Sequence, residues 1–129
     1  MRIALVEFAA KGGLIHYAYQ LGRAMHAEGA DVTLITGAHY ELAGLPHPFR
    51  VEPVLRLWDP KPEADGAGRV RRRARRGLRA LQYYREWMRL MAILRRLEPD
   101  VVQFGDIRFA SDVIPLARAS RGGWLMTDI

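Results

Sequence analysis

Two adjacent glycines, Gly12 and Gly13, separate an apolar N-terminal run from a segment whose apolar residues recur at helical spacing. Glycine lets the backbone approach a ligand closely, and the free amides at the start of a helix attract anions. A diphosphate or a sugar hydroxyl could therefore bind here, whereas a tight turn with a positive φ explains the pair equally well. The stretch matches neither a Walker A loop nor the G-x-G-x-x-G fingerprint, so ATP hydrolysis and NAD binding gain no support.

Ionisable side chains near the predicted sheet edge are the next candidates. His16 lies beside the glycine pair and is the histidine best placed to contact a ligand, with packing or contact with water as the alternative. Asp106, like Glu7 and Asp128, ends or follows a predicted strand, and α/β sheets bind ligands at that carboxyl edge. An Asx turn that caps the loop explains Asp106 as well. The other three histidines are expected at the surface, and no metal site is predicted because cysteine is absent and no histidine stands at metal-ligand spacing.

A run of arginines gives the chain its basic character. The sequence has 20 Lys and Arg against 14 Asp and Glu, and seven of the arginines lie in the acid-free segment 69–79. The candidates for contact with an anionic surface are Arg71, Arg72, Arg73, Arg75 and Arg76. Aromatic residues follow the run, as at membrane interfaces, so an anionic lipid surface is one interpretation. A solvated helix end is the second, and nucleic-acid contact is the weakest because aromatic residues do not interleave the run.

The elements that must position these residues alternate between strand and helix. Apolar and β-branched runs predict strands at 2–8, 31–36, 49–57, 100–104 and 124–127. Helical spacing predicts helices from the glycine pair to about residue 28, over 69–97, and over about 111–121. Pro53 confines the third strand to an edge or a bulge. This order predicts an α/β fold, a Rossmann-like open parallel sheet with helices on both faces, incomplete at the C-terminal end.

The long helix predicted over 69–97 needs one face against the sheet. We expect that face to contain Leu81, Tyr84, Met88 and Met91, joined by Trp87, Leu90, Leu94 and Leu97. A narrow polar stripe toward water would then consist of Gln82, Arg85, Glu86, Arg89 and Arg96.

Length and composition limit the class of protein. The 129 residues suit one domain, 1–129, and half of them are apolar, which argues against disorder. No apolar run approaches the ~18 residues of a membrane span, and the N-terminal run is not a signal peptide because Glu7 interrupts it. The absence of cysteine excludes a disulfide scaffold and indicates a reducing compartment. We expect a cytoplasmic protein, with peripheral binding to the inner face of a membrane as an option.

Three stretches resemble the N-terminal domain of GT-B glycosyltransferases of the family 4-like type. The first, from Gly12 to Thr36, is GGLIHYAYQLGRAMHAEGADVTLIT. The others are PDVVQFGD, from Pro99 to Asp106, and RGGWLMTDI at 121–129. The resemblance covers essentially the whole chain. It implies that 1–129 is an acceptor-side domain whose C-terminal, donor-binding domain is absent.

The resemblance also implies a reaction and a set of site residues. The reaction would move a sugar from a nucleotide-diphosphate sugar to a hydroxyl of an acceptor lipid or glycan, without a cofactor or a metal. Gly12 and Gly13 match the loop beside the donor diphosphate and sugar. His16 and Tyr17, together with Asp106, would line the cleft or the acceptor side.

The chain departs from the family pattern at Gln103 and Gly105, where the family often has histidine. By resemblance the chain is half of an active site, so we expect it to be inactive without the missing C-terminal domain or a partner chain. One alternative is a non-catalytic, membrane-docking subunit of a split glycosyltransferase. A nucleic-acid-binding module is the less favoured alternative.

Overall fold

The structure, a computed structural model, describes residues 1–56, 68–105 and 125–128. Its elements are β1 (Arg2–Glu7), α1 (Gly13–Ala27), β2 (Asp31–Gly37), β3 (Arg50–Leu55), α2 (Arg69–Leu97), β4 (Val101–Phe104) and β5 (Leu125–Asp128). Each of these elements was predicted from the sequence to within a few residues. The helix predicted over about 111–121 lies outside the described residues.

All strand pairs in the described sheet are parallel, and the strand order is β3-β2-β1-β4-β5. The chain starts in the centre, moves outward to β3, and returns by way of α2 to β4 on the other side of β1. This is an open Rossmann-like α/β fold, as the sequence predicted. Pro53 lies in β3, an edge strand of this order, and the register with β2 shifts next to it.

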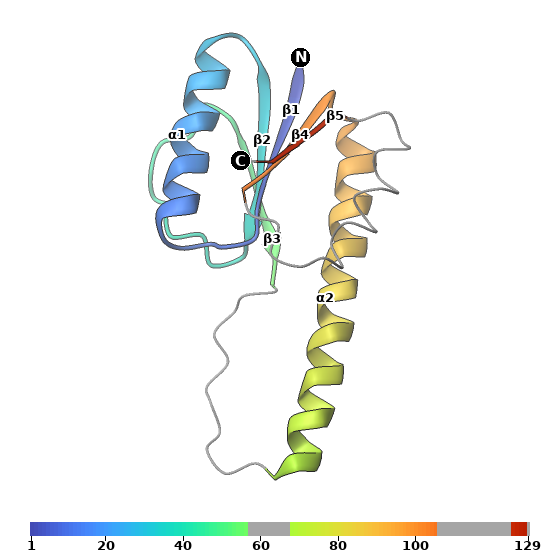
Figure 1. Cartoon of the computed structure of the whole chain (residues 1–129). Helices are drawn as coiled ribbons and strands as arrows, with labels where there is room; N and C mark the ends of the chain where they lie inside the picture. Colours follow the sequence, from blue (N-terminus) through green and yellow to red (C-terminus); the bar gives the residue numbers. More distant parts are fainter. Residues whose placement is uncertain (57–67, 106–124, 129) are drawn as a thin grey trace.

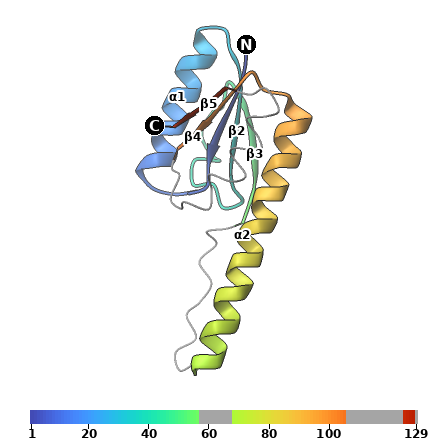
Figure 2. The same ribbon diagram turned by 45° about the vertical axis from the view of Figure 1, so that its right-hand side comes forward.

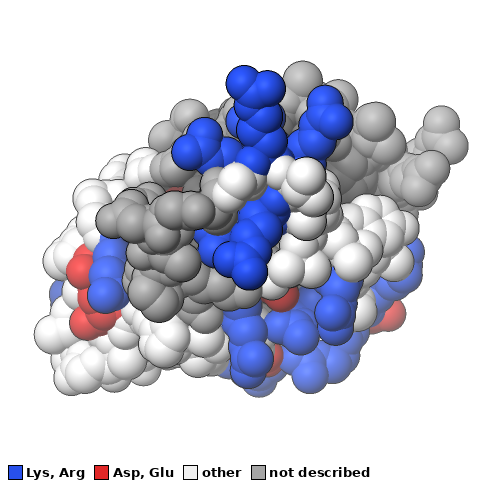
Figure 3. All heavy atoms as spheres, turned by 90° about the horizontal axis from the view of Figure 1, so that it is seen from below, with Lys and Arg blue, Asp and Glu red and all other residues white. Residues whose placement is uncertain are grey.

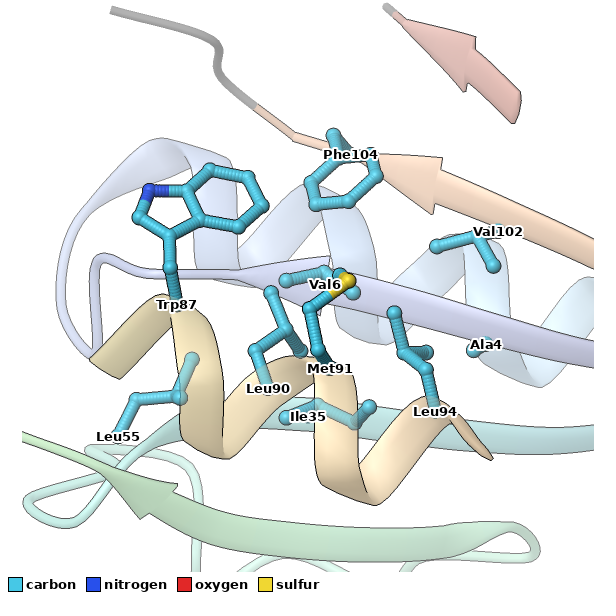
Figure 4. Close-up of a cluster of buried hydrophobic side chains, with 10 residues drawn as sticks. All are labelled: Ala4, Val6, Ile35, Leu55, Trp87, Leu90, Met91, Leu94, Val102 and Phe104. Carbon is cyan, nitrogen blue, oxygen red and sulfur yellow. The ribbon is translucent and has the colours of Figure 1, made fainter. Parts of the chain in front are cut away.

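The two helices cover opposite faces of the sheet (Figure 1). Alternate residues of β1 show the division, because Leu5 packs on the α1 side and Val6 on the α2 side. On the α2 side, Leu90 and Leu94 contact a cluster that includes Val6 and Phe104 (Figure 4). Both leucines are fully buried. Burial of such side chains contributes roughly 1.5–3 kcal/mol each and holds the helix to the sheet.

Only the second half of α2 packs on the sheet. Its buried residues all fall between Glu86 and Leu94, whereas every residue of Arg69–Leu81 is exposed. We call Arg69–Leu81 the projecting half. The projecting half extends beyond the carboxyl edge of the sheet, and both views of the molecule show this (Figures 1 and 2).

The prediction of which side of α2 faces the sheet was wrong for three residues. Leu81, Tyr84 and Met88 are 55%, 59% and 48% exposed, whereas Trp87, Leu90, Met91 and Leu94 are buried as expected. The helix has two apolar sides, and hydrophobic spacing alone does not identify the one that meets the sheet. The sheet receives the side with the tryptophan and the two fully buried leucines.

Glu86 was also expected to face water, and it is buried instead. Its carboxylate accepts a hydrogen bond from the backbone N–H of Arg56 at 3.0 Å and one from Arg89 Nη1 at 3.3 Å. Arg89 Nη1 also donates to the Val54 carbonyl oxygen at 3.2 Å. A buried carboxylate is tolerated when it is hydrogen-bonded and paired in this way. These contacts join α2 to the end of the edge strand β3.

No helix in the described part of the chain has the length and apolar character needed to cross a membrane.

Candidate functional site

The glycine pair lies at the start of α1, with Gly12 as the residue before the helix and Gly13 as its first residue. Gly12 has a φ of 94°, a conformation that residues with a side chain rarely adopt, so its glycine is explained by the turn. Gly13 has no such constraint, and an added Cβ there would meet nothing within 4 Å. Gly12 has no side chain, so the residue before the helix supplies no side-chain cap.

Glu41, which the sequence did not single out, supplies a negative charge beside this helix start. Its Oε1 accepts a hydrogen bond from the Gly12 backbone N–H at 2.8 Å and lies 3.1 Å from Nε2 of His16. Its own backbone N–H donates to the Ala10 carbonyl oxygen at 3.1 Å. A carboxylate is favourable at this end of a helix dipole. A diphosphate that approached Gly12 would therefore meet a negative charge of the protein.

The predicted site residues are only partly brought together. Gly12 and His16 meet through Glu41, while Tyr17 is 48% exposed on α1. Asp106 lies outside the described residues. Among the residues that the structure describes, no three His, Asp or Glu side chains gather as a metal ion would require.

Glu7 and Thr36 lie side by side at the carboxyl ends of β1 and β2, because they are partners in the strand register. They are 2% and 0% exposed. The Glu7 Oε1 accepts a hydrogen bond from the Ala9 backbone N–H at 2.9 Å. A Cβ added to Gly105, just after β4, would lie 3.0 Å from the Glu7 Cδ and closer still to Oε2. The glycine at 105 thus gives room to a buried carboxylate.

A cluster of rings fixes the segment that carries Glu41. The Tyr40 hydroxyl lies 3.0 Å from Nε2 of His47, and the Tyr19 hydroxyl donates to the Pro46 carbonyl oxygen at 2.8 Å. His47, which was expected at the surface, packs edge-on against Tyr19 and Phe49 and is half-buried. Burial, with a smaller effect of Tyr19, raises the pKa of Tyr40 from 10.0 to about 12.

The raised pKa of Tyr40 predicts a loss of stability at high pH. The folded protein holds the phenol proton more tightly, so the contribution of Tyr40 is complete below pH 10 and is lost as the pH rises through about 12. We expect the free energy of unfolding to fall more steeply over this range for the unmodified protein than for Tyr40→Phe, measured by urea denaturation. Tyr17→Phe, at an exposed tyrosine, is the matched control. Equal slopes for the unmodified protein and Tyr40→Phe would contradict this prediction.

The second candidate surface is the projecting half of α2. Its seven arginines are all exposed, and none of them forms an ion pair within the described residues. Figure 3, which views the molecule from the end where α2 projects, shows many basic groups and few acidic ones. The arginines predicted to contact an anionic surface, Arg71, Arg72, Arg73, Arg75 and Arg76, all lie on this half.

Fold and surface together define a Rossmann-like α/β domain that carries a basic projecting helix. No protein-family model and no curated protein matches the sequence. Among solved structures, the chain is similar to the C-terminal domain, residues 78–226, of a hydrogenase from Pyrococcus furiosus. The match has a TM-score of 0.54 at 19% identity and covers 98% of this chain and 89% of the other. At this identity the likeness shows the fold.

These comparisons correct the assignment that the resemblance implied. The similar structure is a domain of a hydrogenase, and nothing in the comparisons supports a glycosyltransferase. The expected family, its transfer reaction, and the split-glycosyltransferase alternative are therefore wrong. The longest stretch behind the resemblance, Gly12 to Thr36, belongs to a βαβ unit, a geometry that many unrelated proteins share.

Proposed function

We propose that this protein binds peripherally to anionic lipid surfaces through the projecting half of α2. The observation that supports this function is the placement of seven arginines, without an acid, on a helix segment that leaves the sheet. Because all seven are exposed, they are free to approach lipid phosphates without any change in the packed core.

The number of arginines suits this role. Each basic residue held near an anionic membrane contributes about 1 kcal/mol, and the attraction falls off within a Debye length of about 10 Å at 0.1 M salt. Several arginines acting together therefore give binding that is measurable at low salt and weakens as salt is added. Outside the segment 69–79 the chain has 13 basic and 14 acidic residues, so the attraction depends on this one segment.

A lipid surface fits this helix better than a nucleic acid does. Large apolar side chains stand exposed on the same helix, Val70 at 83% and Leu78 at 54%. A bilayer offers apolar surface directly beneath its phosphates, whereas a nucleic-acid backbone presents phosphates and sugars. Nucleic-acid binding also lacks a recognition motif in this sequence.

The test is replacement of Arg71, Arg72, Arg73, Arg75 and Arg76 by glutamine. We expect the variant to lose binding to vesicles of phosphatidylcholine and phosphatidylglycerol at low salt, measured by co-sedimentation. The same five positions changed to lysine keep the charge and are the matched control, for which binding should persist. All five side chains are exposed, so neither variant should disturb the fold.

Two outcomes would contradict the proposed function. In the first, the glutamine variant binds the vesicles as well as the unmodified protein does. In the second, the unmodified protein does not bind the vesicles but binds DNA with a steep dependence on salt, which indicates contacts with nucleic-acid phosphates.

A further inference from the structure

We propose that one defined face of α2 enters the lipid. The helix then lies along the membrane, and the sheet lies on the side of the helix that faces away from the membrane. This inference rests on the proposed function and adds which side chains of α2 contact the lipid. The face, which we call the outer stripe, consists of Val70, Ala74, Leu78, Leu81, Tyr84 and Met88.

The spacing of these residues places them on one side of the helix. Successive members are three or four residues apart, the interval that brings side chains above one another. Leu81 and the fully buried Leu90 are nine positions apart, which at 3.6 residues per turn is two and a half turns, so their side chains point to opposite sides of the helix. The outer stripe therefore points away from the sheet while the other side of α2 packs on it.

The exposure of the outer stripe has no explanation in the packing of the described chain. Its five large side chains are between 48% and 83% exposed. Single exposed apolar residues are ordinary on protein surfaces, but a continuous apolar stripe along a helix marks a contact surface.

Arginines border the outer stripe on both sides. Arg71 and Arg73 stand about 100° from Val70 on one side and 60° on the other, at 100° per residue. By the same geometry Arg72, Arg76 and Arg79 lie on the opposite side of the helix. Arg85 lies next to Tyr84 at the other end of the stripe. Arginine stems can lie along an apolar surface while their charged ends reach the phosphates above it. An apolar centre with basic borders matches the layers of an anionic bilayer, with acyl chains beneath phosphates.

The same borders argue against a second copy of this chain as the occupant. Two outer stripes packed together would bring the bordering arginines of both helices side by side. Like charges at such positions disfavour the pair, since helix pairs of this kind use opposite charges beside their apolar seam. Lipid phosphates carry the complementary charge.

The absence of cysteine allows a direct test of which face is inserted. Ala74 belongs to the outer stripe, whereas Ala80, six residues on, points about 120° away from Ala74 and lies at the edge of the stripe, beside Tyr84. Both are exposed alanines on the projecting half. Each is changed to cysteine in turn and labelled with the environment-sensitive fluorophore NBD. On phosphatidylglycerol vesicles we expect a blue shift and quenching by brominated acyl chains for the label at Ala74→Cys, and a smaller shift with weaker quenching for Ala80→Cys.

A second variant, Leu78→Ser with Leu81→Ser, removes apolar surface and keeps every charge. We expect it to bind vesicles at low salt but to be released by less salt than the unmodified protein requires. Its positions are exposed, so folding should be retained.

The results separate this inference from the proposed function. If both labels behave alike on vesicles and the serine variant is indistinguishable from the unmodified protein, insertion is wrong, while a loss caused by the arginine variant still supports docking. If the label at Ala74→Cys shifts without vesicles and the protein sediments as a dimer, a second copy covers the stripe and insertion is wrong. If the unmodified protein binds no vesicle, the proposed function fails as well.

Discussion

Replacing Leu90 by alanine is expected to lower the free energy of unfolding by about 3 kcal/mol. The side chain is 0% exposed and belongs to the cluster between α2 and the sheet, with Val6, Ile35 and Phe104 among its members. Removing it deletes buried apolar contact and leaves a cavity that the rigid sheet cannot close. Urea denaturation followed by circular dichroism measures the change.

Leu81→Ala is the matched control for this prediction. It makes the same chemical change on the same helix, at a side chain that is 55% exposed, and is expected to alter stability by less than about 0.5 kcal/mol. If Leu81→Ala destabilised the protein more than Leu90→Ala, α2 would pack its other side on the sheet. The inference about the outer stripe would then lose its basis.

Gly105→Ala is expected to destabilise the protein by about 2–3 kcal/mol, although it adds a single methyl group. That methyl would lie 3.0 Å from the Cδ of Glu7, a carboxyl group that is 2% exposed at the end of β1. The Gly105 backbone N–H also donates to the Val6 carbonyl oxygen at 2.9 Å, so the backbone cannot shift without losing that bond. Thermal or urea unfolding of the variant gives the cost.

A double-mutant cycle identifies Glu7 as the cause. Glu7→Ala removes the group that the new methyl would meet, so Gly105→Ala should cost much less in that background. Gly44→Ala is a control for the glycine change itself, because nothing lies within 4 Å of a Cβ added there. An equal cost of Gly105→Ala with and without Glu7 would show that the clash does not determine the effect.

The order and bounds of the elements could be predicted from the sequence because local signals mark them. The positive φ of Gly29 ends the turn after α1, and the segment 69–97 contains no proline and a single glycine, Gly77. The face of α2 could not be predicted in the same way. Leu81 and Leu90 both satisfy helical spacing, and only the tertiary contact with the sheet distinguishes them.

The candidate site was predicted less well, since loops bring its groups together. His16 and the glycine pair were found from their position before a helix. Glu41 was missed because it approaches Gly12 only when the ring contacts of Tyr40 and His47 fix the segment between β2 and β3. No local pattern in the sequence predicts those ring contacts. The signal that would have found it is a glutamate shortly after β2, at the same edge of the sheet at which α1 starts.

The charges in the first turn of α2 disfavour the helix. This turn contains no acidic residue, its preceding Gly68 offers no side-chain cap, and basic residues stand where the helix dipole is already positive. Further along, Arg71 and Arg75 repeat at the i, i+4 spacing at which like charges repel. Without tertiary packing to offset this repulsion, the helicity of the projecting half is sensitive to counter-charge. A phosphate-bearing surface would then act as the missing cap, and attachment to it and ordering of the helix would become a single, coupled equilibrium.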